Sequence, residues 1–578
     1  MPSRGGAVHV VTTSRQYKGR TYQSHLLRRS YREGGKVRNE TVGNLSHLPT
    51  PVIDLIRRAL RGEQLAPAAE VFEITKSTPH GDVGAVLQTM RRLGLAALLS
   101  SRRCKEADLV MGMLAARIVA PHTKLATTRW WQTRTLAEEL SISDADEDDL
   151  YAAMDWLLER QNSIEKKLAA RHLEEKGLVL FDLTSSYFEG HTCPLAKRGH
   201  NRDGKRDKLQ VNYGLLADRR GRPIAVSVYD GNTNDPKTLK PQVLKLRNDF
   251  GIHSVVLVGD RGMISQKAIG ELRDIEGLAW ISALKTGQIR ALVKGGQLQL
   301  GLFDKRNLFE LTHPDFPGER LVACHNSELG KLRAHKRTSL LEATKRELEK
   351  VRGMVQRGRL SGQAKIGVRV GRVINKYKVA KHLALQIEDA RFDFKVLEDQ
   401  VNAEAALDGI YVIRTCLSKK QMNAPEAVRS YKALSNVERA FRSMKTLDLE
   451  VRPIHHRLAD RVRGHIFLCM LAYYVEWHML EAWRPLLFSD EDQSAKANRD
   501  PVAPAQRSSN ALAKMTTHAL DDGTPVHSFR TLLEDLATIV RNTCRTPGAG
   551  DQAPTFTVVT TPTVQQQRAI SLLESIRL

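Results

Sequence analysis

Two short runs of apolar residues, each followed closely by an aspartate, constrain this chain more than any other feature of its sequence. Residues 178–181 read LVLF and precede Asp182, and residues 255–258 read VVLV and precede Gly259 and Asp260. A short apolar run bounded by polar residues is typical of a strand that is buried on both faces. A buried carboxylate needs a cation, hydrogen-bond donors or an opening to water. The two aspartates are therefore either caps of strands and turns or ligands of a metal ion.

The segments around these runs predict an α/β sheet. Residues 209–229 read as two strands joined by a turn, and a helix is expected at 237–250. The strand at 254–258 is followed by a helix capped by Ser265 and by a strand at 278–284. The order β-β-β-α-β-α-β is that of a ribonuclease-H-like core. We therefore expect a mixed five-stranded sheet with helices.

Two regions are expected before this core. Residues 1–50 contain short β-prone runs separated by turns and predict a small, basic, β-rich region. Residues 51–176 space their apolar side chains as helices do, and we expect an α-helical domain.

The core itself is expected in two parts. Residues 177–285 form the first part, a large insertion domain occupies 286–424, and residues 425–485 complete the core with a helix that carries a catalytic glutamate. Within the insertion, residues 338–357 predict a long, charged, solvated helix. Residues 486–578 are expected to be a linker and a C-terminal tail, because their first part is rich in Asp, Ser, Ala and Pro.

The chain is strongly basic, which makes a polyanion its natural partner. Lys and Arg number 89 against 65 Asp and Glu, a formal net charge of +24. Such an excess attracts phosphates, so nucleic acid is the favoured partner, and the α-helical domain at 51–176 is expected to bind DNA. No stretch approaches the roughly 20 apolar residues of a membrane-spanning helix, and the start lacks a signal-peptide pattern, so we expect a cytoplasmic protein without membrane contact. The six cysteines show no zinc-binding spacing.

A third carboxylate, Glu438, lies far along the chain in a segment of helical character. In a helix of about 3.6 residues per turn, Lys445 returns to the same side as Glu438. Ser435 and Glu438 also match a capping box, in which the glutamate only closes the start of a helix. Alone, the cap is the favoured interpretation, but beside two strand-borne aspartates the ligand is favoured. We predict Asp182, Asp260 and Glu438 as catalytic, metal-binding residues.

The spacing of Tyr431, Glu438 and Lys445 resembles the Y-(2)-R-(3)-E-(6)-K signature of DDE insertion-sequence transposases, with Asp182 and Asp260 as the two aspartates. Leu434 stands where the signature has arginine, and Arg439 and Arg442 are the nearest substitutes. Flanking stretches, which together span about residues 20–490, are also similar to one branch of that family: residues 30–38 (SYREGGKVR), 231–235 (GNTND), 259–263 (GDRGM), 404–411 (EAALDGIY) and 469–478 (CMLAYYVEWH).

The resemblance implies a bacterial transposase that acts on double-stranded DNA, namely the terminal inverted repeats of its element and a target. It implies two Mg²⁺ or Mn²⁺ ions, about 4 Å apart, held by the three carboxylates. Water would first attack a phosphodiester at the transposon end, and the freed 3′-hydroxyl would then attack target DNA. Tyr431 and Lys445 would hold phosphates near the cut. A homodimer is expected, because two ends must be cut together.

Further basic residues are expected to contact the DNA backbone. They are Arg439 and Arg442, Arg261 beside Asp260, and Lys205 and Arg206 in the basic loop 197–208.

Other polar and aromatic residues have blander interpretations. Asp203 and Asp207 in the same loop are favoured as turn and salt-bridge residues over metal ligands. Adjacent histidines on a helix point about 100° apart, so His455 and His456 are favoured as solvent or phosphate contacts. The tryptophans at 130 and 131 are favoured as core residues over base-stacking ones.

Three other functions stay open. A ribonuclease-H-fold nuclease would hydrolyse DNA with the same metals but would not join strands. An inactive descendant of a transposase would only bind DNA as a regulator, although all three carboxylates are present. A basic scaffold protein would leave the strand-borne carboxylates without a role.

Overall fold

The computed structural model describes residues 6–63, 71–205, 207–299, 301, 303–304, 307–546 and 553–577. It divides the chain into two compact units, Met1–Ser77 with Arg541–Val559 and Thr78–Val540 with Thr560–Leu578. No helix in the described ranges is long and apolar enough to cross a membrane.

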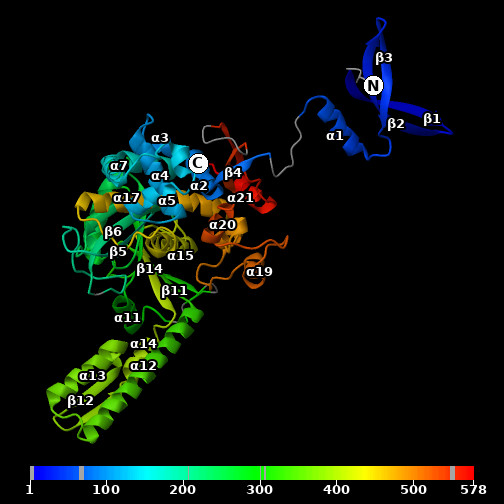
Figure 1. Ribbon diagram of the computed structural model, residues 1–578. Coiled ribbons are helices and arrows are strands. Elements are labelled where there is room, and N and C mark those ends of the chain that lie inside the picture. The colour runs from blue at the N-terminus through cyan, green and yellow to red at the C-terminus, as the bar shows by residue number, and fades with distance from the viewer. Residues whose placement is uncertain are drawn as a thin grey trace. The chain divides into compact units, whose positions relative to one another are not determined.

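The first unit begins with an antiparallel sheet of the order β1-β2-β3 (Figure 1). The strands are β1 (Ala7–Tyr17), β2 (Arg20–Glu33) and β3 (Lys36–Asn44). Lys18 and Gly19, and then Gly34 and Gly35, have positive φ at the two turns, as a tight hairpin that follows the twist of its strands requires. The predicted β-rich region is present, with longer strands than expected. Helix α1 (Thr50–Leu60) follows.

A second sheet in this unit corrects two expectations. Its order is β16-β15-β4, from β4 (Glu73–Pro79), β15 (Val540–Arg545) and β16 (Thr555–Val559). The region 51–176 is therefore not wholly helical, and part of the expected tail 486–578 is a strand pair. The local patterns of these short strands do not show that they pair across more than 460 residues of sequence.

The second unit opens with a layer of helices, which confirms the helical pattern from residue 81 onward. Most residues of α17 (Ala459–Ala482) are buried, and the helix contacts α2, α4 and α7 of this layer as well as the sheet (Figure 1). A helix that is apolar on all sides is a core helix. The layer consists of α2 (Gly81–Arg92), α3 (Leu95–Leu99), α4 (Lys105–Val119), α5 (Lys124–Trp131), α6 (Leu136–Leu140), α7 (Glu147–Glu159) and α8 (Gln161–His172).

The central sheet has eight strands in the order β10-β11-β14-β9-β8-β5-β6-β7. β5 is parallel to β8 and β8 to β9, whereas β5, β6 and β7 form an antiparallel meander. The strands are β5 (Leu178–Phe188), β6 (Leu209–Asp218), β7 (Pro223–Asp230), β8 (Val255–Gly259), β9 (Leu278–Ala283), β10 (Leu308–Leu311), β11 (Arg320–His325) and β14 (Ile410–Thr415).

The helices between the first five strands also follow the predicted order. α9 (Asp235–Leu244) continues into a π-helical turn, Lys245–Asp249, and covers most of the expected helix at 237–250. α10 (Gln266–Arg273) is capped by Ser265 as predicted, since the Ser265 hydroxyl accepts a hydrogen bond from the backbone N–H of Ala268.

The prediction of five strands is wrong in number, because three short strands at 308–325 and 410–415 extend the sheet. These strands fall inside the expected insertion 286–424, together with α11 (Thr286–Lys294), so the segment that leaves the sheet is shorter. That segment holds α12 (Ser327–Gln356), α13 (Gln363–Tyr377), the hairpin β12 (Leu383–Ile387) and β13 (Phe392–Val396), and α14 (Glu398–Ala405). It has its own apolar core, which includes Leu348, Ile366 and Val370. The predicted charged helix is part of α12.

Three helical segments follow the insertion and lead to α17. They are α15 (Ala424–Lys432), α16 (Leu434–Arg442) and a π-helical turn, Ser443–Leu447.

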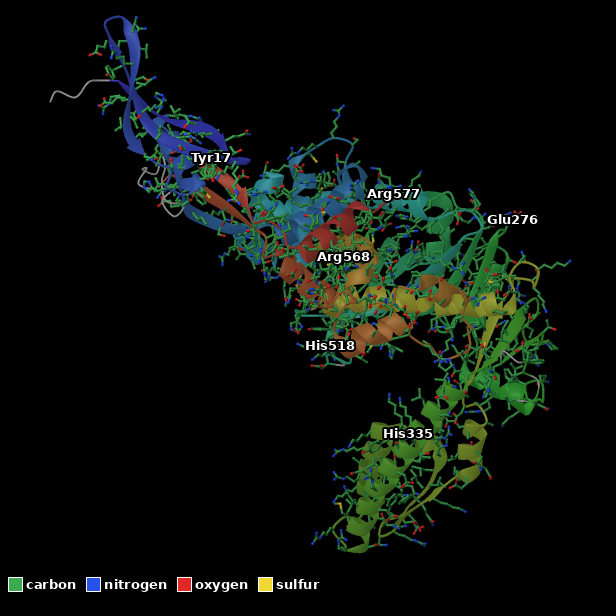
Figure 2. All side chains as sticks on the ribbon, turned by 90° about the vertical axis from the view of Figure 1, so that its right-hand side faces the viewer. Tyr17, Glu276, His335, His518, Arg568 and Arg577 are labelled. Carbon is green, nitrogen blue, oxygen red and sulfur yellow. The ribbon has the colours of Figure 1, made fainter. Side chains whose placement is uncertain are left out.

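The expected linker and tail, 486–578, is mostly folded structure. Phe529, Leu532 and Leu536 on α20 (Phe529–Leu536) are buried, and Trp483 donates a hydrogen bond to the carbonyl of Ala569 over 2.9 Å. Figure 2 labels His518 and Arg568 in this part of the chain. The other helices are α18 (Gln493–Asn498), α19 (Ser509–Thr517) and α21 (Val564–Glu574).

Candidate active site

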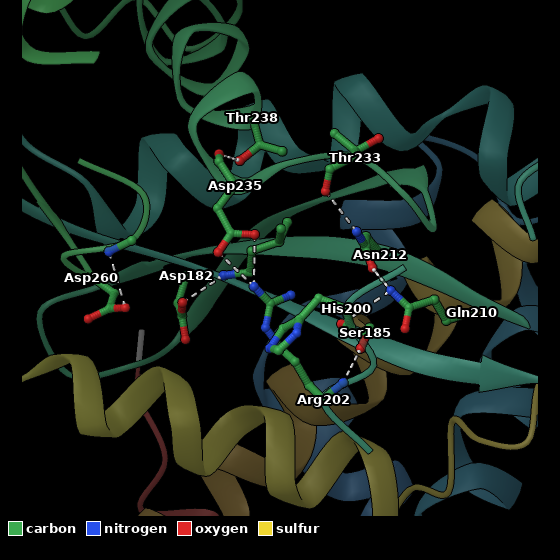
Figure 3. A network of polar contacts seen from close by, with 12 residues as sticks. Asp182, Ser185, His200, Arg202, Gln210, Asn212, Thr233, Asp235, Thr238 and Asp260 are labelled. Carbon is green, nitrogen blue, oxygen red and sulfur yellow. Dashed lines mark hydrogen bonds and ion pairs between the residues drawn. The ribbon is translucent and has the colours of Figure 1, made fainter. Parts of the chain in front are cut away.

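Parallel pairing of β5 and β8 brings Asp182 and Asp260 side by side. The register pairs Phe181 with Gly259, so each aspartate is the next residue along its own strand (Figure 3). The β5–β8 pairing ends there, although β5 continues to Phe188 along its other neighbour, β6. Asp182 is half-buried and Asp260 is exposed. The carboxylates thus stand where one strand ends beside another that continues.

The loop after β8 holds Asp260 in a tight turn. Its carboxylate accepts hydrogen bonds from the backbone N–H of Gly262 over 3.4 Å and from the hydroxyl of Tyr431 over 3.3 Å. A Cβ atom at Gly262 would lie 3.6 Å from Oδ2 of Asp260 and 3.7 Å from Oδ2 of Asp235. A small cavity of about 270 Å³ adjoins Asp260, Tyr431 and Arg261. There is room beside Asp260 for part of a substrate.

Helix α16 carries Glu438 on the face that points away from the core. Its other face packs against β5 and includes Val437 and Phe441, whose ring meets that of Tyr213 edge-on at 5.9 Å. Glu438 is exposed and makes no hydrogen bond or ion pair with any described residue. The helix begins after Ala433 without a side-chain cap. The capping-box interpretation of Glu438 is therefore wrong.

The charges of the three carboxylates act on one another. Burial, and after it the negative charges of Asp260 and Glu438, raise the pKa of Asp182 to about 7, against the opposing effect of the backbone N–H of Leu183 and the guanidinium of Arg202. A carboxylate whose pKa is raised by like-charged neighbours lacks a counter-ion.

The donor set fits a hard divalent cation, because all three groups offer carboxylate oxygens and none is held in an ion pair. Within the ranges that the structure describes, however, no three His, Cys, Asp or Glu side chains already form a closed metal cluster.

Arg202 and Asp235 lie at the site and were not predicted. One guanidinium nitrogen of Arg202 donates to both carboxylate oxygens of Asp235 over 2.8 Å, and the backbone N–H of Arg202 donates to the hydroxyl of Ser185 over 3.1 Å (Figure 3). This anchors Arg202 above β5, where its charge lowers the pKa of Asp182. Both residues could have been found in the sequence, because Asp235 is the last residue of the GNTND motif and Arg202 lies in the basic loop 197–208.

Lys445 is placed differently from the expectation. Its side chain is buried, its ammonium donates to Oδ1 of Asp203 over 3.0 Å, and Arg452 pairs with the same carboxylate. Lys445 lies in the π-helical turn Ser443–Leu447, so the spacing of about 3.6 residues per turn on which the expectation depends does not continue to it. The interpretation of Asp203 as a salt-bridge residue is confirmed.

The other residues predicted to contact the DNA backbone are exposed wherever the structure describes them. Arg261, Arg439, Arg442 and Lys205 are exposed, and Arg206 lies outside the described residues. Leu434, at the signature arginine position, is buried at the start of α16.

The structure also gives the positions of the tryptophan pair and the histidine pair. Trp131 is buried in the core, as favoured, and Trp130 is half-buried. His455 and His456 lie in the segment before α17 and not on a helix, so the helical angle between them does not apply.

A mixed sheet with carboxylates where the pairing of two parallel strands ends defines a class of α/β proteins with an acidic site. The family model described as the transposase DDE domain matches residues 174–475, more than half of the chain, and the chain belongs to that family. Residues 10–70 match the N-terminal domain of IS1634 family transposases, which supports a bacterial insertion-sequence transposase. Its process is DNA transposition, and the family implies an enzyme of the nuclease and transferase class.

Among solved structures, a cryo-EM structure of a piggyBac transposase synaptic complex with hairpin DNA resembles the chain weakly. The TM-score is 0.35 at 8% sequence identity, and the match covers 78% of this chain and 77% of that one. No curated protein matches the sequence.

Proposed function

We propose that this transposase binds the ends of its insertion sequence, cleaves a phosphodiester there by hydrolysis and joins the freed 3′-hydroxyl to target DNA. The observation that carries the proposal is the adjacency of Asp182 and Asp260 on parallel strands, with the charge of Glu438 acting on Asp182. The element order from β5 to β9 supports a ribonuclease-H-like layout of the core.

Asp182, Asp260 and Glu438 would hold two Mg²⁺ or Mn²⁺ ions. When bound, such ions supply Lewis-acid chemistry that favours an attacking oxygen and stabilises a leaving one. The raised pKa of Asp182 supports this role, because a nearby divalent charge stabilises the ionised carboxylate.

The chain's own residues orient the carboxylates. Burial and the charge of Asp260 raise the pKa of Tyr431 above its ordinary value. The phenol therefore stays protonated and donates a hydrogen bond to Asp260. Arg202, held by Asp235, places a positive charge near Asp182 without a direct ion pair. The exposed cations Arg261 and Arg442 are free to contact the phosphates on either side of the cut.

DNA recognition and assembly complete the proposal. The basic β-rich region and the helices before β5 would bind the terminal repeats, where phosphate contacts supply affinity and base contacts supply sequence reading. Two copies of the chain would act together, one for each end of the element.

A joining assay tests the proposal. The full chain is incubated with Mg²⁺, a labelled duplex carrying the element's terminal repeat, and a supercoiled plasmid as target. Label joined to the plasmid supports the transposase. Cleaved duplex without joined product would instead support the hydrolytic nuclease, and tight binding without cleavage would support the inactive regulator.

A further inference from the structure

A basic cavity of about 810 Å³ lies beside the start of α17, away from the three carboxylates. Residues of α4, α5, α7, α17 and the segment 450–458 line it, and Figure 1 shows these helices gathered together. Its lining includes five Lys or Arg residues and four His residues against one acidic residue, Glu450. A cavity with this charge suits an anion.

Several of these cations have no carboxylate partner. Arg452 pairs with Asp203, and Arg461 lies 3.8 Å from a carboxylate oxygen of Asp155. Arg117, by contrast, is 8% exposed and donates only to the carbonyl of His122, over 3.2 Å. The positive charge of the cavity is therefore not neutralised by the described protein groups.

Lys124 is the most deeply buried of the cavity's cations that lack a carboxylate partner. It is 5% exposed, lines the cavity, and its ammonium has no hydrogen-bond partner among the described residues. Burial and the charge of Arg117 lower the pKa of Lys124 to about 7. Nδ1 of His465, which also lines the cavity, is buried without a partner. Unpaired buried cations and donors are costly, and an anion with several acceptor oxygens would satisfy them.

We propose that this cavity is a second phosphate-binding site, which takes a backbone phosphate of the bound DNA. The inference rests on the proposed function for the identity of the anion. Arg452 connects the cavity to Asp203, whose carboxylate accepts a hydrogen bond from the backbone N–H of Tyr187 on β5. Tyr187 is five residues beyond Asp182, or about 16 Å at 3.3 Å per residue.

The length of β5 between Asp182 and Tyr187 can be compared with the spacing of phosphates along one DNA duplex. At a rise of about 3.4 Å per base pair, 16 Å corresponds to roughly five base pairs. A duplex that is cut at the carboxylates and runs along β5 would thus bring another phosphate to the part of the strand that Asp203 and Arg452 connect to the cavity. The site would hold the DNA at a fixed distance from the cleaved bond, which is a positioning task and not a chemical one.

Chemical labelling of lysine tests the site without any need for cleavage. The full chain carrying Asp182→Asn is treated at pH 7 with an amine-reactive reagent, and modified lysines are mapped by mass spectrometry. Lys331, which is 75% exposed, serves as the reference. A lysine with a pKa near 7 has a far larger neutral fraction than an ordinary one, so Lys124 is expected to react at least about tenfold faster.

Two additions, a terminal-repeat duplex and inorganic phosphate, separate the sources of phosphate. A terminal-repeat duplex is expected to protect Lys124 and to leave Lys331 reactive. Protection by inorganic phosphate but not by the duplex would overturn the DNA assignment, and protection by neither would overturn the site. If the duplex protects Lys124 in this variant while the wild-type chain joins no DNA, the cavity stands and the proposed function falls.

Substitutions provide a second test that does not depend on labelling. Lys124→Met removes a buried unpaired charge, so the variant is expected to unfold at a higher temperature in phosphate-free buffer and to lose stabilisation by the duplex. Arg457→Gln at the exposed rim is expected to weaken duplex binding and to reduce the slope of log affinity against log salt by about one. Arg359→Gln, an exposed residue after α12, is the charge-matched control. Equal salt slopes for both arginine variants, or unchanged stabilisation of Lys124→Met by the duplex, would overturn the site.

Discussion

The carboxylate site and the basic cavity contain buried charges of opposite sign, and burial shifts their pKa values in opposite directions. The pKa of Asp182 is raised to about 7, and that of Lys124 is lowered to about 7. In each place like-charged neighbours add to the effect of burial, and no direct ion pair opposes it. The comparison teaches that charged side chains of one sign, gathered at a cavity or a strand end without ion-pair partners, indicate a site for a ligand of the opposite charge.

A third charge cluster shows the contrary case. Asp203 accepts from Lys445 and Arg452, and the side chain of Asp203 is 2% exposed. Here each cation has a carboxylate partner within the protein, so the cluster stabilises the fold and offers no unpaired buried charge to a ligand.

The largest expected effect is on catalysis. Asp182→Asn and Glu438→Gln should each reduce DNA cleavage by at least about a thousandfold, because each removes a ligand charge that the proposed metal site requires. Cleavage of a labelled terminal-repeat duplex measures this, and its binding should change little. Asp274→Asn, an exposed aspartate after α10, is the matched control. Full cleavage by Asp182→Asn would remove the site assignment.

The cluster around Asp203 should respond to mutation through stability. Lys445→Met leaves Asp203 with Arg452 alone, and we expect a loss of about 1–3 kcal/mol in the free energy of unfolding. Urea denaturation measures the loss, with the exposed Lys331→Met as control. The salt slope of DNA binding should stay unchanged. A slope lower by about one, with normal stability, would show that Lys445 contacts a phosphate after all.

The two open clusters should give opposite pH dependences of stability in the presence of a chelator. The folded pKa of Asp182, about 7, lies above its ordinary value of 3.8, so this group lowers stability as pH rises from about 3.8 to 7. Asp182→Asn removes that loss and should gain roughly 1–2 kcal/mol at pH 8.5 but little near pH 4.

For Lys124 the sign is reversed. Its folded pKa, about 7, lies below its ordinary 10.5, so stability is lost as pH falls from about 10.5 to 7. Lys124→Met should therefore gain most at pH 6 and progressively less above pH 8. Thermal unfolding of both variants at several pH values checks the pair. If the stability gains of both variants rose, or both fell, with increasing pH, the proposed contrast between the two clusters would be wrong.

The smallest effect is expected at the exposed cations near the carboxylates. Arg442→Gln should weaken binding of the terminal-repeat duplex by only a few fold and lower its salt slope by about one, because one phosphate contact is lost. Fluorescence anisotropy at several salt concentrations measures it. No change relative to Arg359→Gln would place Arg442 away from the DNA.

The core of the site could be predicted from local sequence, because the apolar runs before Asp182 and Asp260 determine buried strands wherever they pack. The same reasoning placed Glu438 on a helix. It also could have found α20, since Phe529, Leu532, Leu533 and Leu536 have helical spacing, but the polar composition before them concealed the pattern.

Other features were decided only by the tertiary structure. The π-helical turn that carries Lys445, the sheet strands at 308–325 and 410–415, the pairing of β4 with β15 and the gathering of cations around Lys124 all depend on segments far apart in the chain. Sequence by itself determined the buried strands that precede Asp182 and Asp260 and the helical character of the segment with Glu438, because periodicity is a local property. Which of those segments meet, and therefore which charges are paired and which remain open, depends on packing between distant segments, and only the folded chain fixes that.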